Sequence, residues 1–456
     1  MFDYPLFEMP VLGQRMLFAL DAVLHVLVSH GAAVGASIVL ATANWYALRT
    51  KDERFDQLVY KLLMAFFIVS TAIGALTGIG IWVHANIINP PAIGSLLRVF
   101  FWKWFIEWIV FNFEMVLLLY WFLKWKEWSG EKKKYSVRIG IAYAVSSWLT
   151  MAIITAILGF MMTPGGWLND EFPPKVNYLV SLFNPSWLPS LAFRTFGAIV
   201  LSTGFILYYT WLFTRNDLAL RERAFKFFSK FLLGAIVPAA LGGYWYYLQF
   251  PPQAKALFPQ ALMTTQYLGY KDIALMGIAG LVLLLVLLGF FFFSRPKLVP
   301  FLGTTLAIGA LVILTGVFER VREFSRKPYI VYGYMYAHGI RVDDVPLLNK
   351  EGILKHAVFV PDSVRTITDE NRAEAGHFLY RTECKVCHTL NGINPIVDRV
   401  RGMSEDAIFT RIGVLNSPAT PWMPPFVGTE EERRALAHFL FLETQSVIPG
   451  VELSSR

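Results

Sequence analysis

The chain has little charge and almost no cysteine. Only 16% of its 456 residues are Asp, Glu, Lys or Arg, whereas soluble globular proteins carry about 25%. Together with the low charge, a positive mean hydropathy of +0.48 excludes a disordered chain and a nucleic-acid-binding domain, although the formal net charge is +8. The two cysteines, Cys384 and Cys387, lie three positions apart, so there is no disulfide framework to find.

Apolar length is what the chain has in abundance. Hydrophobic residues make up 55% of it and aromatic residues 16%. Several apolar runs each reach the ~20 residues that a bilayer core requires. We therefore expect an all-α polytopic membrane protein with about eight transmembrane helices and a small all-α domain after them. The predicted spans lie near 16–47, 57–88, 96–124, 138–162, 190–214, 227–249, 272–294 and 299–322.

Lys and Arg mark every second loop between these runs. They follow the first, third, fifth and seventh runs, whereas the alternate loops at 84–94, 163–189 and 249–269 are rich in Pro and Gly and poor in basic residues. Basic loops favour the cytoplasmic side, although charges can also simply solvate a loop. The alternation predicts a multi-pass protein of a bacterial-type inner membrane, embedded in lipid, with both termini on the periplasmic side. The first run lacks the features of a cleaved signal peptide and is expected to be retained.

The composition changes after Arg326. Residues 340–456 have ordinary charge density and several turn signals. We predict a transmembrane domain over 1–330, a linker over 331–364 and a soluble domain over 365–456. With the C-terminus outside, that soluble domain is expected on the periplasmic side.

The soluble domain contains Cys384-Lys385-Val386-Cys387-His388, a C-x-x-C-H sequence. Two thiols at this spacing can form thioethers to haem vinyl groups, and the adjacent His388 can ligate the iron. A redox dithiol or half of a zinc site is the alternative. A zinc site needs a second ligand pair, which the chain lacks, and a dithiol does not need the histidine. The spacing favours one covalent haem c.

The segment around this sequence resembles a class I cytochrome c domain over about residues 365–446. A helix is predicted before the motif and another after Met423-Pro424-Pro425-Phe426. The resemblance places Met423 at the sixth ligand position of the haem iron, although a lone methionine more often packs in a core. His377 and His438 are expected to be surface or packing residues.

Ionisable side chains inside membrane spans are energetically costly and are candidates for function. Imidazole and thioether groups are haem-iron ligand types, and neighbouring groups tune the iron. The candidates within the predicted spans and at their ends are His25, His30, Glu107, Glu114, Arg194, Glu319 and Glu323.

The membrane part resembles the large, haem-bearing subunit of cytochrome bd oxidases. The similar motifs occur in the family's order at Arg15–His25, Gly74–Gly78, Gly159–Pro164 and Glu323–Tyr329. The resemblance implies His25 as the ligand of the high-spin haem and Glu323 near a haem iron. It also implies catalytic roles for Arg326, which belongs to the last motif, and for Glu107 and Glu114. The spacing of these two carboxylates is one residue shorter than that of the family's paired carboxylates.

The sequence departs from that family at three places. Met276 matches the methionine ligand of the family's low-spin haem b, but Arg194 stands where the histidine ligand is expected. An arginine stays protonated and cannot ligate iron, so that haem is either lost or held differently, and Arg194 is instead a candidate partner for a haem propionate. The stretch at 249–271 is too short for the family's quinol-oxidising loop, and the soluble domain stands where its ninth helix is expected.

The roles of three histidines remain open from the sequence. His84 and His338 are candidate replacement ligands, although neither lies in a matching motif and a structural role is favoured for both. His30 lies about 140° from His25 around an ideal helix, which favours hydrogen bonding over ligation. Glu319 lies one turn from Glu323 and is expected to carry protons or to pair with Arg322 or Arg15.

These patterns predict a bd-like terminal oxidase subunit. Electrons would enter through the haem c and dioxygen would be reduced at one to three non-covalent haems near His25 and Glu323, of type b with type d as an open alternative. A second membrane subunit and a c-type cytochrome or other redox subunit are the expected partners, and no nucleic acid is. The alternative is an electron-transfer module without oxygen chemistry that links quinone or another redox complex to a periplasmic cytochrome.

Overall fold

The structure is a computed structural model that describes residues 7–165, 181–263, 265–357 and 360–446. Contacts divide the chain into two compact units. The first, which we call the terminal unit, comprises Met1–Asp21, Gly80–Arg98 and Arg326–Arg456. The second, the helical unit, comprises Ala22–Ile79 and Val99–Ser325.

Eight helical stretches of the described residues are long and apolar enough to cross a membrane. They overlap the eight predicted spans and confirm the predicted all-α polytopic fold. Much of the predicted loop at 163–189 lies outside the described residues. The stretches are Gln14–Thr50, Glu53–Ile88, Pro90–Glu127, Gly130–Met162, Trp187–Phe213, Leu218–Leu248, Leu268–Ser294 and Phe301–Ser325.

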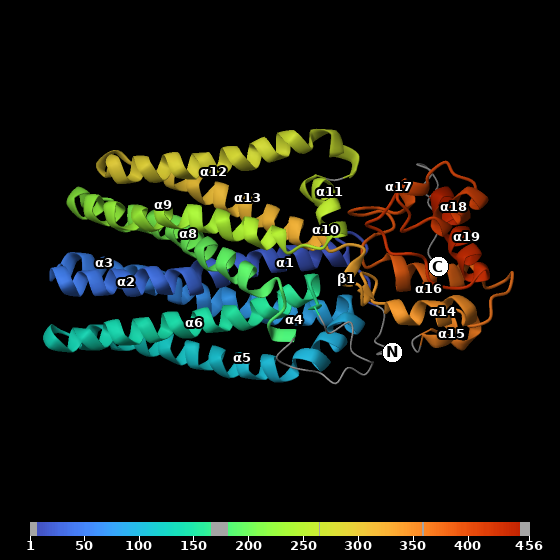
Figure 1. Ribbon diagram of the computed structural model, residues 1–456, viewed down its shortest axis with the longest axis horizontal. Helices are drawn as coiled ribbons and strands as arrows, with labels where there is room; N and C mark the ends of the chain where they lie inside the picture. Colours follow the sequence, from blue (N-terminus) through green and yellow to red (C-terminus); the bar gives the residue numbers. More distant parts are fainter. Residues whose placement is uncertain (1–6, 166–180, 264, 358–359, 447–456) are drawn as a thin grey trace. The chain divides into compact units, whose positions relative to one another are not determined.

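In the helical unit, α8 is the central helix: it packs against α9, α2, α6 and α13 (Figure 1). The membrane-spanning stretches, parts of which belong to the terminal unit, consist of α1 (Gln14–Val28), η1 (Ser29–Val34), α2 (Gly35–Thr50), α3 (Glu53–Ile68), η2 (Val69–Gly74), α4 (Ala75–Ile88), α5 (Pro90–Lys124), α6 (Lys133–Met162), α8 (Trp187–Phe213), α9 (Leu218–Leu248), α12 (Lys271–Ser294) and α13 (Phe301–Ser325). Short helices connect them: η3 (Trp125–Glu127), η4 (Gly130–Lys132), α10 (Pro252–Ala256), α11 (Phe258–Leu262), η6 (Thr265–Tyr270) and η7 (Pro296–Leu298).

Two π-helical turns interrupt the first two spans. They are η1 and η2, and they contact each other. A π turn inserts an extra residue into the helical register and often occurs at functional sites. Just after η1, Gly35 lets α2 approach α8 closely, because a Cβ atom there would lie 2.0 Å from the carbonyl oxygen of Ala198.

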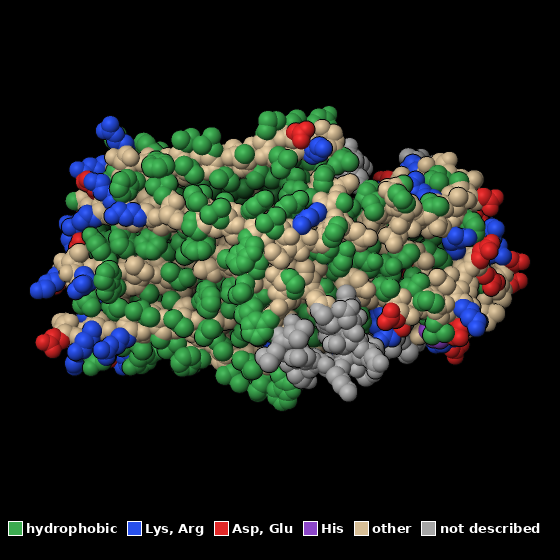
Figure 2. All heavy atoms as spheres, in the orientation of Figure 1, with side chains coloured by type: hydrophobic (Ala, Val, Ile, Leu, Met, Phe, Trp, Pro, Cys, Tyr) green, Lys and Arg blue, Asp and Glu red, His purple; other side chains and the backbone are tan. Residues whose placement is uncertain are grey.

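The four basic loops meet at one end of the helical unit. Lys and Arg side chains gather there (Figure 2), and ion pairs join loops that are far apart in the sequence. The predicted alternation of basic loops therefore corresponds to one end of the bundle, while the assignment of that end to the cytoplasm stays a prediction. The pairs are Arg223–Asp52 at 3.3 Å, Lys297–Glu222 at 3.0 Å, Lys133–Asp56 at 2.7 Å, and Arg54–Asp217.

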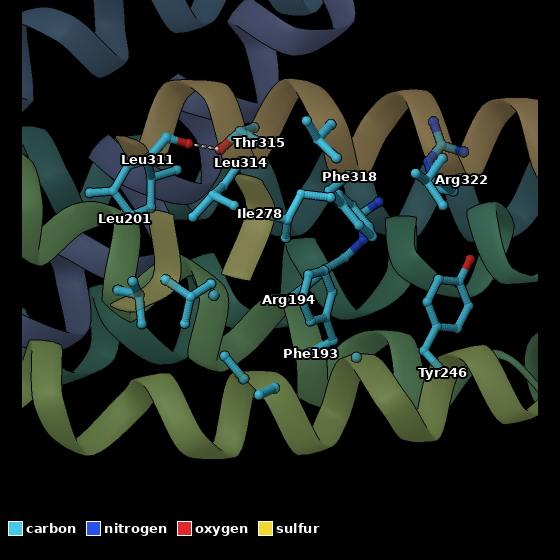
Figure 3. A pocket seen from close by; sticks show the side chains of 18 of the residues that line it. Phe193, Arg194, Leu201, Tyr246, Ile278, Leu311, Leu314, Thr315, Phe318 and Arg322 are labelled. Carbon is cyan, nitrogen blue, oxygen red and sulfur yellow. Dashed lines mark hydrogen bonds between the residues drawn. The ribbon is translucent and has the colours of Figure 1, made fainter. Parts of the chain in front are cut away.

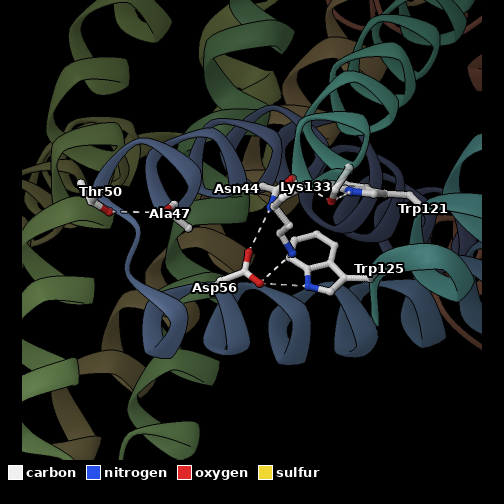
Figure 4. Close-up of polar contacts among 8 residues, drawn as sticks. Asn44, Ala47, Thr50, Asp56, Trp121, Trp125 and Lys133 are labelled. Carbon is white, nitrogen blue, oxygen red and sulfur yellow. Dashed lines mark hydrogen bonds and ion pairs between the residues drawn. The ribbon is translucent and has the colours of Figure 1, made fainter. Parts of the chain in front are cut away.

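A polar network ties α2, α3 and α6 together near this end (Figure 4). The carboxylate of Asp56 accepts hydrogen bonds from Asn44 at 3.2 Å, Trp125 at 3.3 Å and Lys133 at 2.7 Å. Ser136 donates to Asn44 at 2.9 Å. Because buried polar groups are costly without partners, this network fixes the register of the three helices.

The terminal unit contains a short antiparallel hairpin and several small helices. Helix α16 packs against α19, and both contribute to its hydrophobic core. The elements are β1 (Tyr329–Val331), β2 (Met335–Tyr336), η8 (Val342–Asp344), α14 (Val345–Glu351), α15 (Ile353–His356), η9 (Asp362–Val364), α16 (Arg372–Leu379), η10 (Tyr380–Cys384), α17 (Val397–Val400), α18 (Glu405–Gly413) and α19 (Glu430–Ser446).

The segment predicted as a linker packs into this core. Leu348, Ile353 and Leu354 belong to the same hydrophobic cluster as the side chains of α16 and α19. The buried carboxylate of Glu432 in α19 accepts hydrogen bonds from the backbone N–H groups of Ile353 at 3.1 Å and Leu354 at 2.8 Å. This clamp fixes α15 against α19, while the predicted domain boundaries stay predictions.

Candidate functional sites

The C-x-x-C-H segment forms a compact turn that follows a π-helical turn, η10. The backbone N–H of Lys385 donates to Tyr380 at 3.0 Å, and that of His388 donates to Cys384 at 2.9 Å. The Nδ1–H of His388 can donate to the carbonyl oxygen of Asn394 at 3.1 Å, a contact that selects the tautomer with its lone pair on Nε2. This arrangement orients a metal-ligating imidazole.

The electrostatics of this segment fit a haem c attachment site. Burial lowers the pKa of His388 to about 4, so its imidazole is neutral and able to ligate at neutral pH. Burial also raises the pKa of the Cys384 thiol. Reactive redox cysteines have lowered pKa values, so this environment does not favour a redox dithiol.

The N-terminal segment Phe7–Arg15, which we call the strap, contacts this segment within the terminal unit. Lys385 donates to the carbonyl oxygen of Phe7 at 2.6 Å, and Ile393 N–H donates to that of Val11 at 2.9 Å. Arg15 at the start of α1 approaches the Cys387 sulfur at 3.5 Å. Gly392 is required for this approach, because a Cβ there would lie 2.2 Å from the Val11 oxygen.

Met423 lies in a turn in which its N–H donates to Thr420 at 3.0 Å. It is half-buried, and the core cluster of the described terminal unit includes Met403 but not Met423. Its assignment as an iron ligand stays a prediction. Nearby, the ring Nε2 of His338 lies 3.3 Å from the carbonyl oxygen of Pro425.

The other candidate histidines of the terminal unit have structural partners. His84 Nδ1 lies 2.8 Å from Asp21, His438 Nδ1 lies 2.9 Å from Glu405, and the His377 ring packs 5.2 Å from the ring of Phe439. These contacts agree with the structural roles that the sequence favoured.

In the helical unit, His25 is oriented by the motif that follows η2. Its Nδ1 lies 3.1 Å from the hydroxyl of Thr77, whose own hydrogen is donated to the carbonyl oxygen of Ile73 at 2.8 Å. The hydroxyl must then accept from Nδ1–H, which leaves the tautomer with its lone pair on Nε2. Gly78 adjoins the ring, because a Cβ there would lie 3.4 Å from it. His25 therefore fits the role of a haem ligand.

Arg194 lies in a buried cluster of charged side chains. It lies 3.5 Å from Glu319 and 3.1 Å from Nε2 of His30, and Arg322 binds the same Glu319 at 2.8 Å. Glu323 is close enough to Glu319 and Arg322 to interact electrostatically. Glu319 therefore pairs with Arg322, one of the two partners expected from the sequence, and also with Arg194.

A cavity of about 460 Å³ adjoins Arg194, among α8, α9, α12 and α13 (Figure 3). His30 is the histidine among its lining residues, and both ring nitrogens already have partners, Ser29 at 3.0 Å and Arg194 at 3.1 Å. Met276 is 64% exposed and does not line the cavity. The residues around this cavity do not fit a low-spin haem with histidine and methionine ligands.

Two carboxylates predicted to handle protons share one helix, α5. Glu114 is buried and accepts a hydrogen bond from Thr150 at 3.1 Å. Glu107 lies near enough to interact with it electrostatically. Their catalytic role stays a prediction. The catalytic role of Arg326, a buried residue at the beginning of the range Arg326–Arg456 of the terminal unit, also stays a prediction.

Sequence reasoning missed the residues that support the proposed ligands. Thr77 was part of a recognised motif but had no assigned role, and Asn394 had none either. The signal for Thr77 is its place in Gly74–Gly78, on the face that meets His25. No local sequence pattern indicates the role of Asn394, because it contacts His388 through its backbone carbonyl oxygen, which every residue has.

Comparison with known proteins bears on the membrane part. Residues 14–250, just over half of the chain, match the family described as cytochrome bd terminal oxidase subunit I. Among solved structures, the chain is similar to "The structure of bd oxidase from Geobacillus thermodenitrificans", with a TM-score of 0.61, 18% identity, and coverage of 71% of this chain and 88% of that one. At this identity the likeness shows the fold alone. No curated protein matches the sequence.

Proposed function

The chain belongs to the cytochrome bd terminal oxidase subunit I family, and from that premise we propose that it is the haem-bearing subunit of a bd-like complex fed through a haem c. The family assigns it to the membrane part of a bd-type respiratory oxidase. The finer proposal is that dioxygen is reduced at a b- or d-type haem near His25 and Glu323. The observation that carries it is His25 held by Thr77 in the tautomer that ligates iron.

Haem bound at these positions supplies electron transfer and dioxygen reduction. The protein's own residues hold it and handle protons. Thr77 orients His25, while Glu107 and Glu114 provide two carboxylates on the long helix α5. Carboxylates inside membrane spans commonly form proton relays, so we assign proton delivery to this pair.

The proposed point where electrons enter is the C-x-x-C-H segment. The strap supports this assignment, because it binds that segment directly to the start of α1 within the terminal unit. The same helix carries His25 further along. We propose that the terminal unit lies on the periplasmic side, and that a c-type cytochrome or neighbouring redox subunit supplies electrons. A second membrane subunit completes the complex.

A second candidate function is electron transfer without oxygen chemistry. Two observations favour it: Arg194 replaces the expected haem ligand, and the described residues form the short helices α10, α11 and η6 where the family's large quinol-oxidising loop is expected. In this case the terminal haem c would exchange electrons with quinone or another redox complex.

Oxygen uptake separates the two functions. The purified complex, supplied with a reduced c-type cytochrome, is expected to consume dioxygen, and a His25→Ala variant is not. A spectrum taken alongside shows whether a long-wavelength chlorin band of haem d is present. If the membrane haems are reduced but no oxygen is consumed, the electron-transfer function replaces the oxidase function.

A further inference from the structure

Two prolines follow Met423 in the terminal unit and limit the hydrogen bonds that this stretch can make. Met423 N–H donates to the carbonyl oxygen of Thr420 at 3.0 Å. Pro424 and Pro425 have no N–H group, so their backbone offers carbonyl oxygens but no donors. We call residues 423–428 the methionine loop. Its shape therefore depends on donors that other segments bring to its carbonyl groups.

The far end of the methionine loop is fixed by two side chains. The N–H of Val427 donates to the carboxylate of Glu383 in η10 at 2.8 Å. The N–H of Gly428 donates to the side-chain oxygen of Asn349 in α14 at 2.9 Å. These two contacts hold the loop four and five residues after Met423, so the part next to Met423 requires a support of its own.

His338 provides that support. It is only 8% exposed and lies just after β2. The backbone N–H of Ile340 donates to its Nδ1 at 3.3 Å. Because a backbone N–H can only donate, Nδ1 carries the lone pair and the hydrogen is on Nε2. The Nε2–H then donates to the carbonyl oxygen of Pro425 at 3.3 Å, two residues after Met423.

The ring of His338 is neutral at neutral pH. Burial lowers the pKa of His338 from 6.5 to about 4, so the ring carries one hydrogen over the physiological range. The ring of Tyr336 packs against it, with 5.7 Å between the ring centroids. One protonation state and a packed ring give His338 one hydrogen-bonding pattern, which is what a group that fixes a loop requires.

The turn that carries His338 is itself anchored at the corner where α4 ends and α5 begins. Asn89 lies in this corner and is buried, and its side-chain amide donates to the carbonyl oxygen of Ala337 at 3.0 Å. Its side-chain oxygen accepts the N–H of Ala92, in the first turn of α5, at 3.3 Å. Gly339 permits this close approach, because it has a φ of +92° and a Cβ atom there would lie 2.7 Å from the Asn89 side-chain oxygen. Asn89 therefore joins the corner to the turn.

We propose that His338 is a positioning residue for Met423, the predicted sixth ligand of the haem c iron, and that Asn89 holds His338 in place. Hydrogen bonds from these two residues connect the corner between α4 and α5 to the methionine loop within the terminal unit. Groups that orient a metal ligand strengthen its binding, and a loop fixed beforehand loses less conformational freedom when its ligand binds. The inference rests on the proposed haem c and assigns it a residue from the segment predicted as a linker.

Competition by added imidazole measures how firmly Met423 is held. A ferric haem with a methionine ligand has a charge-transfer band at the red end of the spectrum, which disappears when imidazole displaces the methionine. The titration uses the oxidised, purified full-length complex. His338→Phe keeps a flat ring but removes the donor, and losing one hydrogen bond is expected to raise the apparent imidazole affinity roughly three- to tenfold. Asn89→Ala leaves His338 unchanged and is expected to raise that affinity as well.

His438→Phe and Asn86→Ala are the matched controls. His438 pairs with Glu405 at 2.9 Å, and the side-chain amide of Asn86 donates to the carbonyl oxygen of Trp82 in its own helix at 2.7 Å. Both controls should keep the imidazole affinity of the wild type. Covalent haem per chain shows whether each variant folds, and Asn89→Ala decides the proposal alone if His338→Phe does not fold.

An imidazole affinity in His338→Phe equal to that of the wild type would overturn the proposal, and so would an equal rise in the controls. A wild type that has covalent haem but lacks the charge-transfer band would overturn it too, because Met423 would then not bind the iron. A wild type without covalent haem would instead refute the haem c of the proposed function. Haem staining therefore distinguishes the two failures.

Discussion

Replacing Thr77 with valine should loosen a membrane haem without removing its ligand. The Thr77 hydroxyl accepts the hydrogen bond from Nδ1 of His25 at 3.1 Å and donates to Ile73 at 2.8 Å. Valine has nearly the same shape but no hydroxyl. The variant therefore leaves His25 in place while removing the group that fixes its tautomer and ring orientation.

The expected size follows from losing one such contact. A neutral hydrogen bond contributes about 0.5–1.5 kcal/mol, and loss of a group that orients a metal ligand typically lowers metal affinity about 10–100-fold. Tenfold corresponds to about 1.4 kcal/mol, which lies near the upper end of the energy range and at the lower end of the affinity range. We expect haem affinity at this site to fall by about tenfold.

The assay measures transfer of non-covalent haem from the purified complex to excess apomyoglobin, with the covalent haem as internal standard. Thr71→Val is the matched control, because the Thr71 hydroxyl donates to backbone carbonyl oxygens of the preceding helical turn, at 2.7 Å for Phe67, rather than to a histidine. His25→Ala should lose this haem entirely. If Thr77→Val retains haem as the wild type does, or if Thr71→Val loses as much, the assigned role of Thr77 is wrong.

Four further outcomes are expected. Cys384→Ala with Cys387→Ala should abolish haem staining of the denatured 51.8 kDa chain; staining that persists would refute haem c. In stopped-flow experiments, a reduced c-type donor should reduce the membrane haems faster than quinol does, and quinol acting first would contradict the proposed electron route. Burial lowers the pKa of His338 from 6.5 to about 4, so the unfolded state binds more protons between these values. The terminal unit should lose up to about 3 kcal/mol of stability as the pH falls from about 6.5 to 4, and His338→Gln should flatten that dependence in a thermal melt. Glu319→Gln should destabilise the helical unit by about 3–5 kcal/mol, because two buried guanidinium groups lose their shared partner, whereas an equally stable variant would show that the cluster contributes little.

The sequence is informative wherever a local pattern determines the structure. Apolar length predicted all eight spans, because a bilayer requires it, and alternating Lys and Arg predicted which loops lie at the same end of the bundle. The spacing of Cys384, Cys387 and His388 predicted a haem c attachment site, which stays a prediction. His25 was predicted as a haem ligand through a motif, and the structure adds the hydroxyl of Thr77 beside its ring.

Contacts between distant segments could not be predicted in this way. Arg15 and Cys387 are 372 positions apart, and nothing in either local sequence indicates that the strap contacts the C-x-x-C-H segment. The π turns η1 and η2 could not be predicted from the sequence either, because an extra residue in a helical turn depends on packing as well as on composition. Nothing in the local sequence of the predicted linker indicates that Glu432 fixes α15 to α19 through the backbone N–H groups of Ile353 and Leu354.

The two largest departures from the family are Arg194 in place of a histidine ligand and the added C-x-x-C-H segment. Under the proposed function, the first accounts for the second. An arginine at position 194 needs buried carboxylates, because a guanidinium without counter-charges is too costly inside a membrane protein. Glu319 meets that need, and the cluster it forms with Arg322 and His30 leaves no pair of iron ligands around the cavity. A membrane domain without its low-spin haem requires another route for electrons to reach the remaining haem. Under the proposed function, a haem c held by the C-x-x-C-H segment would provide such a route, and the strap binds that segment to the start of the helix that carries His25.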